Sequence, residues 1–570
     1  MRRVSLTLLL LSIPVLNSAF AQNVPPGQQA GVQAQRFKEE SLLKKESFEQ
    51  KIPRAVEMAA PEKPSGTMAE SVSFVLQDIV ISGSTTFEAW DLKPEYASYL
   101  GKKITFKELN LIVGKIEARY KAKGYLTTIA FLPKQSIKDG VVEIQVAEGN
   151  MGNLIIEGDK RALAMKDLVE KYFHTLKYDL FNINTLQRDL LRLNQNSDMQ
   201  FSSTLAPGKT PQTTDVILKV KSSNPYHGGF RFDNQGSRST GKLRESCYFH
   251  SSNVSGHFDS FFANIISSTN TLGESFSYTL PMGTYGTKFG IDITHFKMKI
   301  GKEFKPYHIR GETQIYTPHV SWELALKEDF QATFETGLDI KSITQETNYN
   351  KSSDDQLRIP YFELNLMKSD PYGQTTFNPK VSFGTSSWWG SSVADHSSAS
   401  RLGSGGTFVK YLQSLGRVEK MPFESYLSVR SQFQASSQTL PSSEQFQIGG
   451  ANSVRGYPEG DYVADWGGNL SADWVMPMYL IPKEWKLLRT DMPLRNFIEP
   501  VLFFDIGGGS IEKTMPGERK YKFLMGTGFG LRLQYSNDVS LKLDYGFPVG
   551  NKPTSGVGPA NLYVTLQVNK

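Results

Sequence analysis

Residues 539–547 read VSLKLDYGF, and their side chains alternate between apolar and polar. The apolar positions are Val539, Leu541, Leu543, Tyr545 and Phe547, and the positions between them are Ser540, Lys542, Asp544 and Gly546. Strict alternation over this length predicts a β-strand. Charged residues at regular intervals on the second face indicate a surface in contact with water rather than a dry core.

The same alternation recurs throughout the second part of the chain, for example in GFGLRLQY (528–535) and LYVTLQVN (562–569). About sixteen such segments lie between Tyr226 and Asn569, which leaves roughly 22 residues for each strand and its connection. Aromatic residues make up 12% of the chain and glycines number 48 of 570, a profile typical of outer-membrane barrels. We therefore predict a transmembrane β-barrel of about sixteen antiparallel strands over residues 224–570, with an aqueous lumen unless something fills it.

The N-terminal sequence predicts export from the cytoplasm. MRRVSLTLLLLSIPVLNSAFA (1–21) has two arginines, a short apolar run and a small-residue end, so we expect a signal peptide cleaved after Ala21, with a membrane anchor as the alternative. Losing Arg2 and Arg3 lowers the formal net charge of +6 by two, which is too little and too dispersed to indicate nucleic acid as a partner. The single cysteine, Cys247, excludes a scaffold held by internal disulfides.

Residues 22–70 are polar and contain one helix-forming stretch. QAQRFKEESLLKKESFEQ (33–50) has a possible i,i+4 pair, Glu40 with Lys44, and a sparse apolar stripe at Phe37, Leu42, Leu43 and Phe48. Such a polar helix suits a water-filled cavity, and a disordered charged tail is the alternative interpretation. Prolines and glycine between residues 53 and 66 predict a linker after it.

Residues 71–149 and 150–223 form a repeat. Each begins with a predicted strand that ends at a turn, continues through sequence with helical periodicity, and closes with a pair of predicted strands, in the order β-α-α-β-β. In the first unit Leu109, Ile112, Ile116 and Tyr120 share one helical face, and in the second Leu186, Leu190 and Leu193 do so. We predict two small α+β domains, each with an exposed sheet edge.

A glycine-rich stretch, FQIGGANSVRGYPEGDY (446–462), carries a single basic residue, Arg455. One interpretation is a surface turn with a solvated arginine. The other is a loop (437–466) folded into the barrel, where Arg455 would meet a carboxylate. The strand RNFIEPVLFFDIGGGS (495–510) offers Asp505 on its inner face, with Phe503 beside it and Gly507 allowing close approach. Phe503 and Tyr457 would then shield the pair from water.

Several of these stretches together resemble one family, the two-partner secretion translocators of haemolysin secretion/activation type, within the superfamily of POTRA-bearing outer-membrane barrels. FQIGGANSVRGY resembles the family's lumenal loop, with its tip at Val454, Arg455, Gly456 and Tyr457, and LFFDIGGG resembles the strand that meets it. GFRFDNQGSRSTGKLRES (229–246) is similar to the family's first barrel strands. LAPGKTPQTTDVILKV (205–220) and RYKAKGYLTTIAFLP (119–133) are similar to parts of its two POTRA domains.

The resemblance implies a function. An unfolded partner exoprotein of adhesin or cytolysin type would be recognised by periplasmic POTRA domains and exported through a barrel in the outer membrane of a Gram-negative bacterium. The helix at 33–50 would plug the pore, and the loop pair would be structural. Other partners would be outer-membrane lipid and, during biogenesis, the barrel-assembly machinery. The alternatives are an insertase of the same superfamily and a passive porin or receptor.

The chain offers no pattern for catalysis. Its eight histidines include no i,i+4 pair, and H-E-x-x-H, C-x-x-C, G-x-S-x-G and P-loop motifs are all missing, so we expect no catalytic residue, metal or cofactor, and no enzyme activity. GTGFG (526–530) is expected to ease packing against the inserted loop. Two features have no assigned role: the terminal Lys570, where the family usually has an aromatic residue, and the basic, apolar connection at 477–496.

Overall fold

The computed structural model describes residues 26–49, 73–175, 177–195, 198–487, 493–514, 518–535, 538–554 and 558–569. The predicted signal peptide, the predicted linker and Lys570 lie outside the described residues. The chain divides into two compact units, Lys51–Asn224 and a second made of Met1–Gln50 with Pro225–Lys570. Each is described by itself.

The first unit contains the two predicted α+β repeats. The first repeat comprises β1 (Ser73–Val75), β2 (Asp78–Ser82), α3 (Ala89–Leu92), β3 (Lys103–Thr105), α4 (Phe106–Ala122), β4 (Ile129–Phe131) and β5 (Val141–Ala147). The second comprises β6 (Asn150–Gly158), α5 (Lys160–Ala164), α6 (Lys166–Lys171), α7 (Ile183–Asn194), β7 (Met199–Pro207) and β8 (Thr213–Ser222). The short β1–β3 pair is an addition to the predicted order.

The long helices form where the sequence supplies caps and an apolar face. Thr105 and Glu108 make a reciprocal capping box at the start of α4, and the Asn182 side chain accepts from the amide of Asn184 at the start of α7. The buried face of α4 carries the predicted residues, Leu109, Ile112, Ile116 and Tyr120. The buried residues of α7 likewise include Leu186, Leu190 and Leu193.

Each repeat packs its helices on a three-stranded sheet with one parallel and one antiparallel pairing. The orders are β2-β5-β4 and β6-β8-β7, so β5 and β8 are central and the other four strands lie at edges. The repeats join where the amide of Ile183 donates to the Gly124 carbonyl oxygen at 2.9 Å. Gly124 has φ +94°, a left-handed conformation suited to glycine at a helix end.

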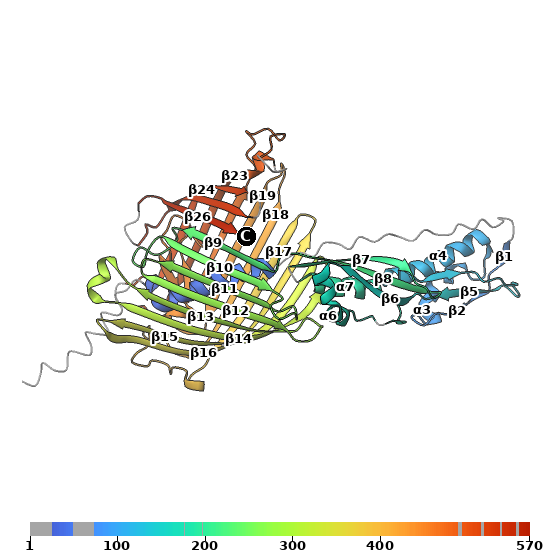
Figure 1. The fold of residues 1–570 in the computed structure, drawn as a ribbon, viewed down its shortest axis with the longest axis horizontal. Helices are drawn as coiled ribbons and strands as arrows, with labels where there is room; N and C mark the ends of the chain where they lie inside the picture. The colour runs from blue at the N-terminus through green and yellow to red at the C-terminus, as the bar shows by residue number, and fades with distance from the viewer. Residues whose placement is uncertain are drawn as a thin grey trace, which may run out of the picture. The chain divides into compact units, whose positions relative to one another are not determined.

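The second unit is a closed, antiparallel sixteen-stranded barrel, as predicted (Figure 1). Its strands are β9 (Tyr226–Asp233), β10 (Arg244–Ser252), β11 (Ser260–Ser268), β12 (Thr271–Pro281), β13 (Lys288–Lys299), β14 (Arg310–Leu326), β15 (Phe330–Thr347), β16 (Asn350–Asp370), β17 (Gly373–Gly384), β18 (Phe408–Lys420), β19 (Tyr426–Ser436), β22 (Trp466–Val475), β23 (Ile498–Ser510), β24 (Tyr521–Tyr535), β25 (Val539–Val549) and β26 (Asn561–Asn569). Strand β26 pairs with β9, from Thr565 with Asp233 to Asn569 with Gly229, and this pairing closes the ring.

Alternation along the strands sorts the two faces of the wall. On β23, Val501, Phe503 and Asp505 are buried inside, whereas Leu502 and Phe504 are 49% and 45% exposed on the outside. Because neighbouring strands are antiparallel, their connections alternate between two rims. We call the rim at which β9 begins the Pro225 rim. The connections 421–425 and 476–497 lie at this rim, and residues 437–465 leave from the opposite one.

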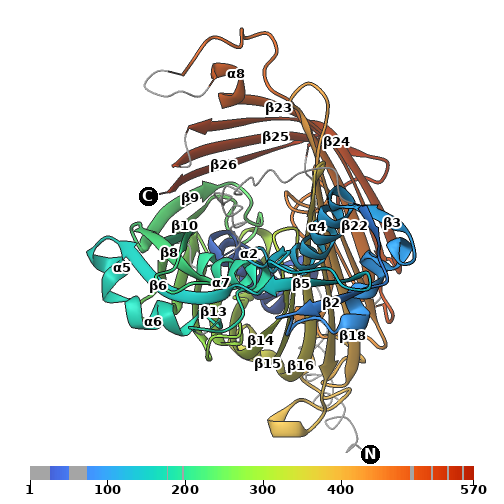
Figure 2. The same ribbon diagram turned by 90° about the vertical axis from the view of Figure 1, so that its right-hand side faces the viewer.

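Among the described residues, two elements occupy the lumen. Helix α2 (Ala30–Glu49) lies within the ring of strands (Figure 2) and begins earlier than the predicted helix. Residues 437–465 fold inward from the opposite rim and carry the short strands β20 (Phe446–Ile448) and β21 (Tyr462–Ala464), which pair with each other.

Candidate functional site

The lumenal loop turns back on itself between β20 and β21, and its tip reaches the barrel wall. Val454 and Tyr457 are fully buried, and Arg455 is only 1% exposed, so the alternative of a solvated surface turn is wrong. Gly456 has φ +98°, and a Cβ there would lie 2.6 Å from the carbonyl carbon of Phe547. Glycine is required at this position because both the conformation and the close approach exclude a side chain.

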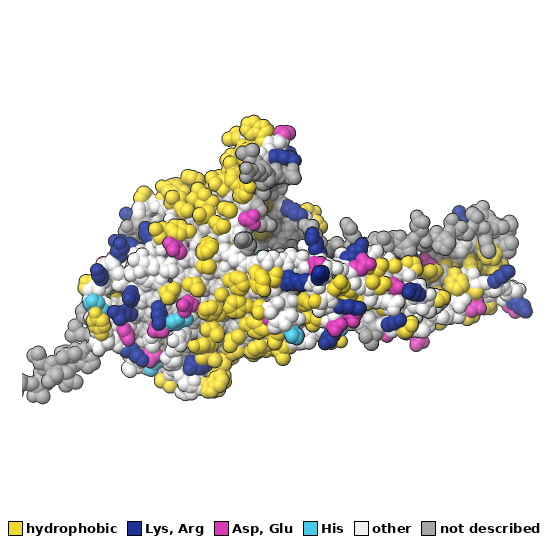
Figure 3. Space-filling view, in the orientation of Figure 1, with side chains coloured by type: hydrophobic (Ala, Val, Ile, Leu, Met, Phe, Trp, Pro, Cys, Tyr) yellow, Lys and Arg dark blue, Asp and Glu magenta, His cyan; other side chains and the backbone are white. Residues whose placement is uncertain are grey.

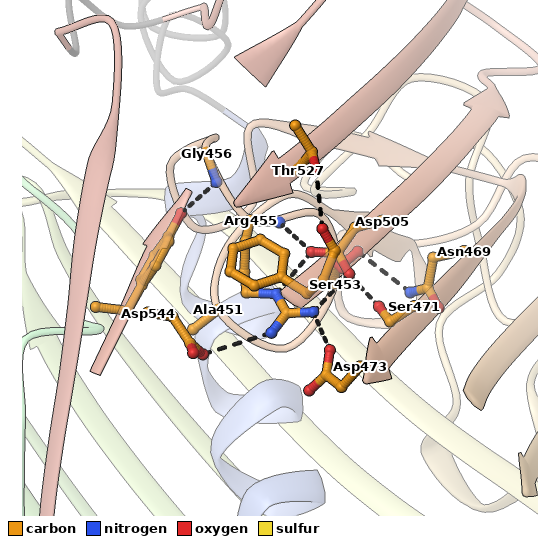
Figure 4. A network of polar contacts seen from close by, with 12 residues as sticks. Ala451, Ser453, Arg455, Gly456, Asn469, Ser471, Asp473, Asp505, Thr527 and Asp544 are labelled. Atoms are coloured by element: carbon orange, nitrogen blue, oxygen red, sulfur yellow. Dashed lines mark hydrogen bonds and ion pairs between the residues drawn. The ribbon is translucent and has the colours of Figure 1, made fainter. Parts of the chain in front are cut away.

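Arg455 forms a two-pronged contact with Asp505 (Figure 4). Its Nε donates to Oδ2 and its Nη2 to Oδ1, both at 2.7 Å, and its backbone amide also donates to Oδ2 at 3.0 Å. The Phe503 ring lies against the guanidinium, with the ring centroid 3.6 Å from Cζ. The structure therefore places Asp505 and Phe503, both named from the sequence, against Arg455. Burial opposes the charged form, but the hydrogen bonds that Arg455 donates to Asp505 outweigh it and raise the pKa of Arg455.

Two further carboxylates face the same guanidinium, and sequence reasoning did not connect them with it. Asp473 accepts from Nη2, and Asp544 accepts from Nη1 at 3.4 Å. Arg532 balances part of this charge, since its Nη1 lies 2.6 Å from Asp544. The alternation of residues 539–547 had placed Asp544 on the inner face, so an inward acidic residue on each nearby strand is the signal that would have found the site.

The cluster connects the loop tip to several strands at once. Asp473 lies on β22, Asp505 on β23 and Asp544 on β25. Tyr563 on β26 adds to the contacts, because its hydroxyl donates to the Tyr457 carbonyl oxygen at 2.7 Å and accepts from the amide of Gly456 at 3.1 Å. The tip therefore bridges the last strands of the barrel rather than a single one.

Glycines in the wall make room for the tip. A Cβ at Gly526 would lie 1.9 Å from the Arg455 carbonyl oxygen, and one at Gly507 would lie 2.9 Å from side-chain atoms of Ile448 and Val454. The expected packing role of GTGFG (526–530) is therefore seen at Gly526. Tyr457 is buried beside the tip, and its hydroxyl donates to the Asn551 carbonyl oxygen at 2.7 Å.

Helix α2 is held in the lumen mainly by charged pairs. Lys38 lies 2.6 Å from Asp339 on β15, Lys45 lies 3.5 Å from Asp292 on β13, and Glu40 lies 3.2 Å from Arg244 on β10. Its buried apolar side chains include Ala30, Ala34 and Phe37, which pack against the wall. Leu43, part of the predicted stripe, is 66% exposed.

The helix also touches the loop. Arg36 lies 3.0 Å from Glu459, and the side chain of Gln447 donates to the Val32 carbonyl oxygen at 2.9 Å. Burial raises the pKa of Glu459, and Arg36 offsets only part of this effect. The two lumenal elements therefore share a boundary, and a change in one alters contacts of the other.

Other buried ion pairs fix the stem of the loop, and sequence reasoning missed them as well. Glu444 lies between Lys341, at 2.6 Å, and Lys410, and Arg401 lies 3.0 Å from Asp465. In the part of the chain that the structure describes, no group of His, Cys, Asp or Glu side chains is arranged to hold a metal ion. Among the same residues, no helix has the length and hydropathy needed to cross a membrane.

Comparisons with known proteins identify the relatives of this architecture. Residues 212–533 match the family model of the haemolysin secretion/activation protein ShlB/FhaC/HecB, and residues 74–149 match the POTRA domain, ShlB-type. The chain is similar to the outer membrane transporter CdiB of Dickeya dadantii, with 24% identity over 474 residues, covering 80% of this chain and 81% of that protein. It is also similar to the heme/hemopexin transporter protein HuxB of Haemophilus influenzae, with 23% identity over 471 residues and 80% of each chain.

Solved structures show the same fold. CdiB from Escherichia coli superposes with a TM-score of 0.73 at 20% identity and covers the whole of both chains. BamA from Haemophilus ducreyi, lacking POTRA domains 1–3, gives a TM-score of 0.51 at 12% identity over 88% of this chain and the whole of that one.

Proposed function

The chain belongs to the ShlB/FhaC/HecB family of haemolysin secretion/activation proteins, and we propose how its lumen controls export. It is a two-partner secretion transporter of the outer membrane, with POTRA domains in the periplasm, and it exports a partner exoprotein. The family is one of transporters, not enzymes. The Pro225 rim, from which β9 begins, is therefore the periplasmic rim.

In this proposal the loop tip is a fixed part of the pore and α2 is the removable part. The observation that carries it is the contrast within one lumen. Arg455 is enclosed by Asp505, two further carboxylates and Phe503, whereas α2 is held mostly by ion pairs to polar walls. Polar groups that leave a wet lumen regain hydrogen bonds from water, so their release costs little. A buried guanidinium has no such replacement.

The partner is first held by the POTRA sheets. Their edge strands expose apolar side chains, including Val80 on β2, Ile129 and Phe131 on β4, and Ile155 on β6. An extended chain that pairs with such an edge gains main-chain hydrogen bonds, and pockets for alternate side chains give selectivity. The partner is an exoprotein of adhesin or cytolysin type, and the barrel-assembly machinery inserts the barrel during biogenesis.

Single-channel conductance in planar bilayers tests the division of roles. The proteins are wild type, Arg455→Ala, Asp505→Ala and a deletion of residues 30–49. Arg417→Ala is a matched control, because Arg417 also forms a short ion pair, 2.6 Å to Asp370, but in a partly exposed position. We expect a large steady pore from the deletion, matching changes in gating from the first two variants, and wild-type behaviour from the control.

The result separates this function from a passive porin. A constant conductance shared by all five proteins would show that neither the helix nor the arginine controls the pore. An insertase of the superfamily is distinguished by export itself. Cells lacking this protein should lose the exoprotein from their surface while their other barrels assemble normally.

A further inference from the structure

The connection between β22 and β23 is far longer than a strand turn needs, and it is ordered where the structure describes it. We call residues 476–487 and 493–497 the rim hairpin. Its two arms bond to each other, since the amide of Met478 donates to the Arg495 carbonyl oxygen at 3.0 Å and that of Leu494 to the Trp485 carbonyl oxygen at 2.7 Å. The second arm contains α8 (Leu494–Phe497).

The neighbouring connection, residues 421–425, supports the rim hairpin. Lys483 lies 2.7 Å from one carboxylate oxygen of Glu424, and Arg495 pairs with the other. The Tyr479 hydroxyl donates to the Phe423 carbonyl oxygen at 2.7 Å. Two cations thus neutralise the acidic residue, so it does not oppose contact with an apolar or anionic surface.

The side chains on this support are unusually apolar for exposed connections. Leu480 is 92% exposed, Phe423 84%, Trp485 60% and Tyr479 51%. The rim hairpin stands out from the barrel at the top of Figure 3, where hydrophobic side chains cover its outer end and basic side chains lie beside them. Exposed apolar clusters of this kind mark an interaction surface, because soluble connections are normally polar.

The position of the hairpin indicates its partner. In two perpendicular views α8 lies outside the ring of strands, next to β23 (Figures 1 and 2). The apolar cluster continues the lipid-facing surface of the wall, where Trp474 is 43% and Leu502 49% exposed. A periplasmic partner on its way into the pore passes through the lumen, whereas the outer side of a barrel wall at its rim borders the bilayer.

We propose that the rim hairpin, with residues 421–425, is a lipid-binding element that inserts Leu480, Phe423 and Trp485 into the periplasmic leaflet of the outer membrane. Tryptophan and tyrosine are favoured at the level of lipid headgroups, and neighbouring lysine and arginine side chains contact lipid phosphates. The element is rooted in β22 and β23, the strands that carry Asp473 and Asp505. This inference depends on the outer-membrane location of the protein and not on the proposed gating.

Lipid-dependent quenching tests the proposal on the full-length protein. Cys247→Ser removes the native cysteine, and an environment-sensitive fluorophore is placed at Leu480→Cys. The control site is Lys107→Cys, on an exposed position of α4 in the first POTRA domain. Both proteins are reconstituted in vesicles of phosphatidylethanolamine and phosphatidylglycerol that contain nitroxide lipids.

We expect nitroxides at the headgroup or at the top of the acyl chain to quench the label at 480 at least about threefold more than the label at 107. Brominated lipids should also quench wild type more than Trp485→Phe, which checks the result without a label at 480. Equal quenching at 480 and 107, with equal access to aqueous iodide, would overturn the proposal. In that case the cluster faces water and not the bilayer.

Discussion

The loop tip and helix α2 lie in the same lumen, and both are rich in ion pairs, yet their surroundings differ. Around the tip, Phe446, Ile448, Val454 and Tyr457 form an apolar cluster with residues of the wall, and the charged pair lies beside it. The helix buries only small apolar side chains and Phe37, namely Ala30, Val32, Ala34 and Phe37, and its other contacts with the wall are mainly charged pairs. The number of ion pairs therefore does not decide which element is fixed. An element is fixed when water cannot replace the partners of its charged groups after the contact breaks.

The largest effect is expected where a buried charge loses its partner. Arg455→Ala leaves Asp473, Asp505 and Asp544 facing one another, and removing one member of a buried pair costs about 3–5 kcal/mol. Unfolding of the purified barrel in denaturant measures this loss. The control Arg417→Ala removes a partly exposed pair that water screens, so it should change the free energy of unfolding far less. Similar losses from both variants would contradict the comparison.

A smaller loss of stability is expected when the positive charge at position 455 stays but the two-pronged contact with Asp505 is lost. Arg455→Lys keeps one positive charge, but an ammonium group cannot reproduce two parallel contacts with Asp505 or the flat packing on Phe503. We expect a loss of about 1.5–3 kcal/mol in the same experiment, the worth of a charge-assisted hydrogen bond. If lysine matches arginine, net charge alone holds the tip and geometry is irrelevant.

The sequence predicts the fold better than it predicts the site, because apolar–polar alternation gives the face on which a residue lies but not its contacts across the lumen. Alternation assigns each barrel residue to one face, so it places Asp505 and Asp544 inside and Leu502 outside. It says nothing about which inward residues of distant strands meet across the lumen. Arg455 and Asp505 were paired because glycines and the family resemblance singled them out. No sequence feature singles out the pairs Lys38 with Asp339 and Glu444 with Lys341. Their pairing depends on how α2 and the loop stem are positioned inside the closed barrel.

The variant Lys38→Ala tests how helix α2 is held in the lumen. Lys38→Ala deletes the closest pair between α2 and the wall, 2.6 Å to Asp339. We expect the ratio of closed to open pores to fall by about tenfold, equivalent to about 1.4 kcal/mol. Asp339 keeps a second cation, because Lys341 lies 3.6 Å away, so the free energy of unfolding should fall less than in Arg455→Ala. Conductance and denaturant unfolding on the same samples check both parts. Lys305→Ala, at an exposed site on a connection between strands, is the control and should alter neither.

An engineered disulfide between helix α2 and the lumenal loop tests whether the helix must leave the pore during export. A Cβ built on Gly31 lies 2.9 Å from the Cβ of Ser443, so cysteines at both positions form a disulfide after an outward shift of the helix of about 1 Å. Oxidation should hold the pore closed and stop export, and reduction should restore both. Export that continues with the disulfide formed would show that α2 stays in place during transport, contrary to the proposed division of roles.

The smallest effect concerns a carboxylate that holds a turn through neutral donors, outside the membrane. Glu148 in the first POTRA domain accepts from the amides of Thr85, at 3.0 Å, and Thr86, at 2.9 Å, and from the hydroxyl of Tyr120 at 3.0 Å. Like Asp505, it binds backbone amides, but the donors around this turn carry no charge. It therefore isolates the hydrogen-bonding part of the contact made at the loop tip.

The pH dependence of this turn follows from the direction of its pKa shift. Burial raises the pKa of Glu148, but the hydrogen bonds from Thr85 and Thr86 outweigh it and lower the pKa below its usual value. A lowered pKa means that the stabilisation is fully present above the unfolded-state value of about 4.3 and disappears as the pH falls through the lower folded-state value. Hydrogen exchange of residues 84–87 should therefore show protection near neutral pH that weakens in acid. Glu148→Gln should weaken protection by about 1 kcal/mol and flatten this pH dependence, whereas Glu157→Gln, at an exposed edge position, should not. If Glu148→Gln keeps the wild-type profile, the carboxylate charge contributes nothing to such turns, and the strength of the Asp505 contact must come from the guanidinium alone.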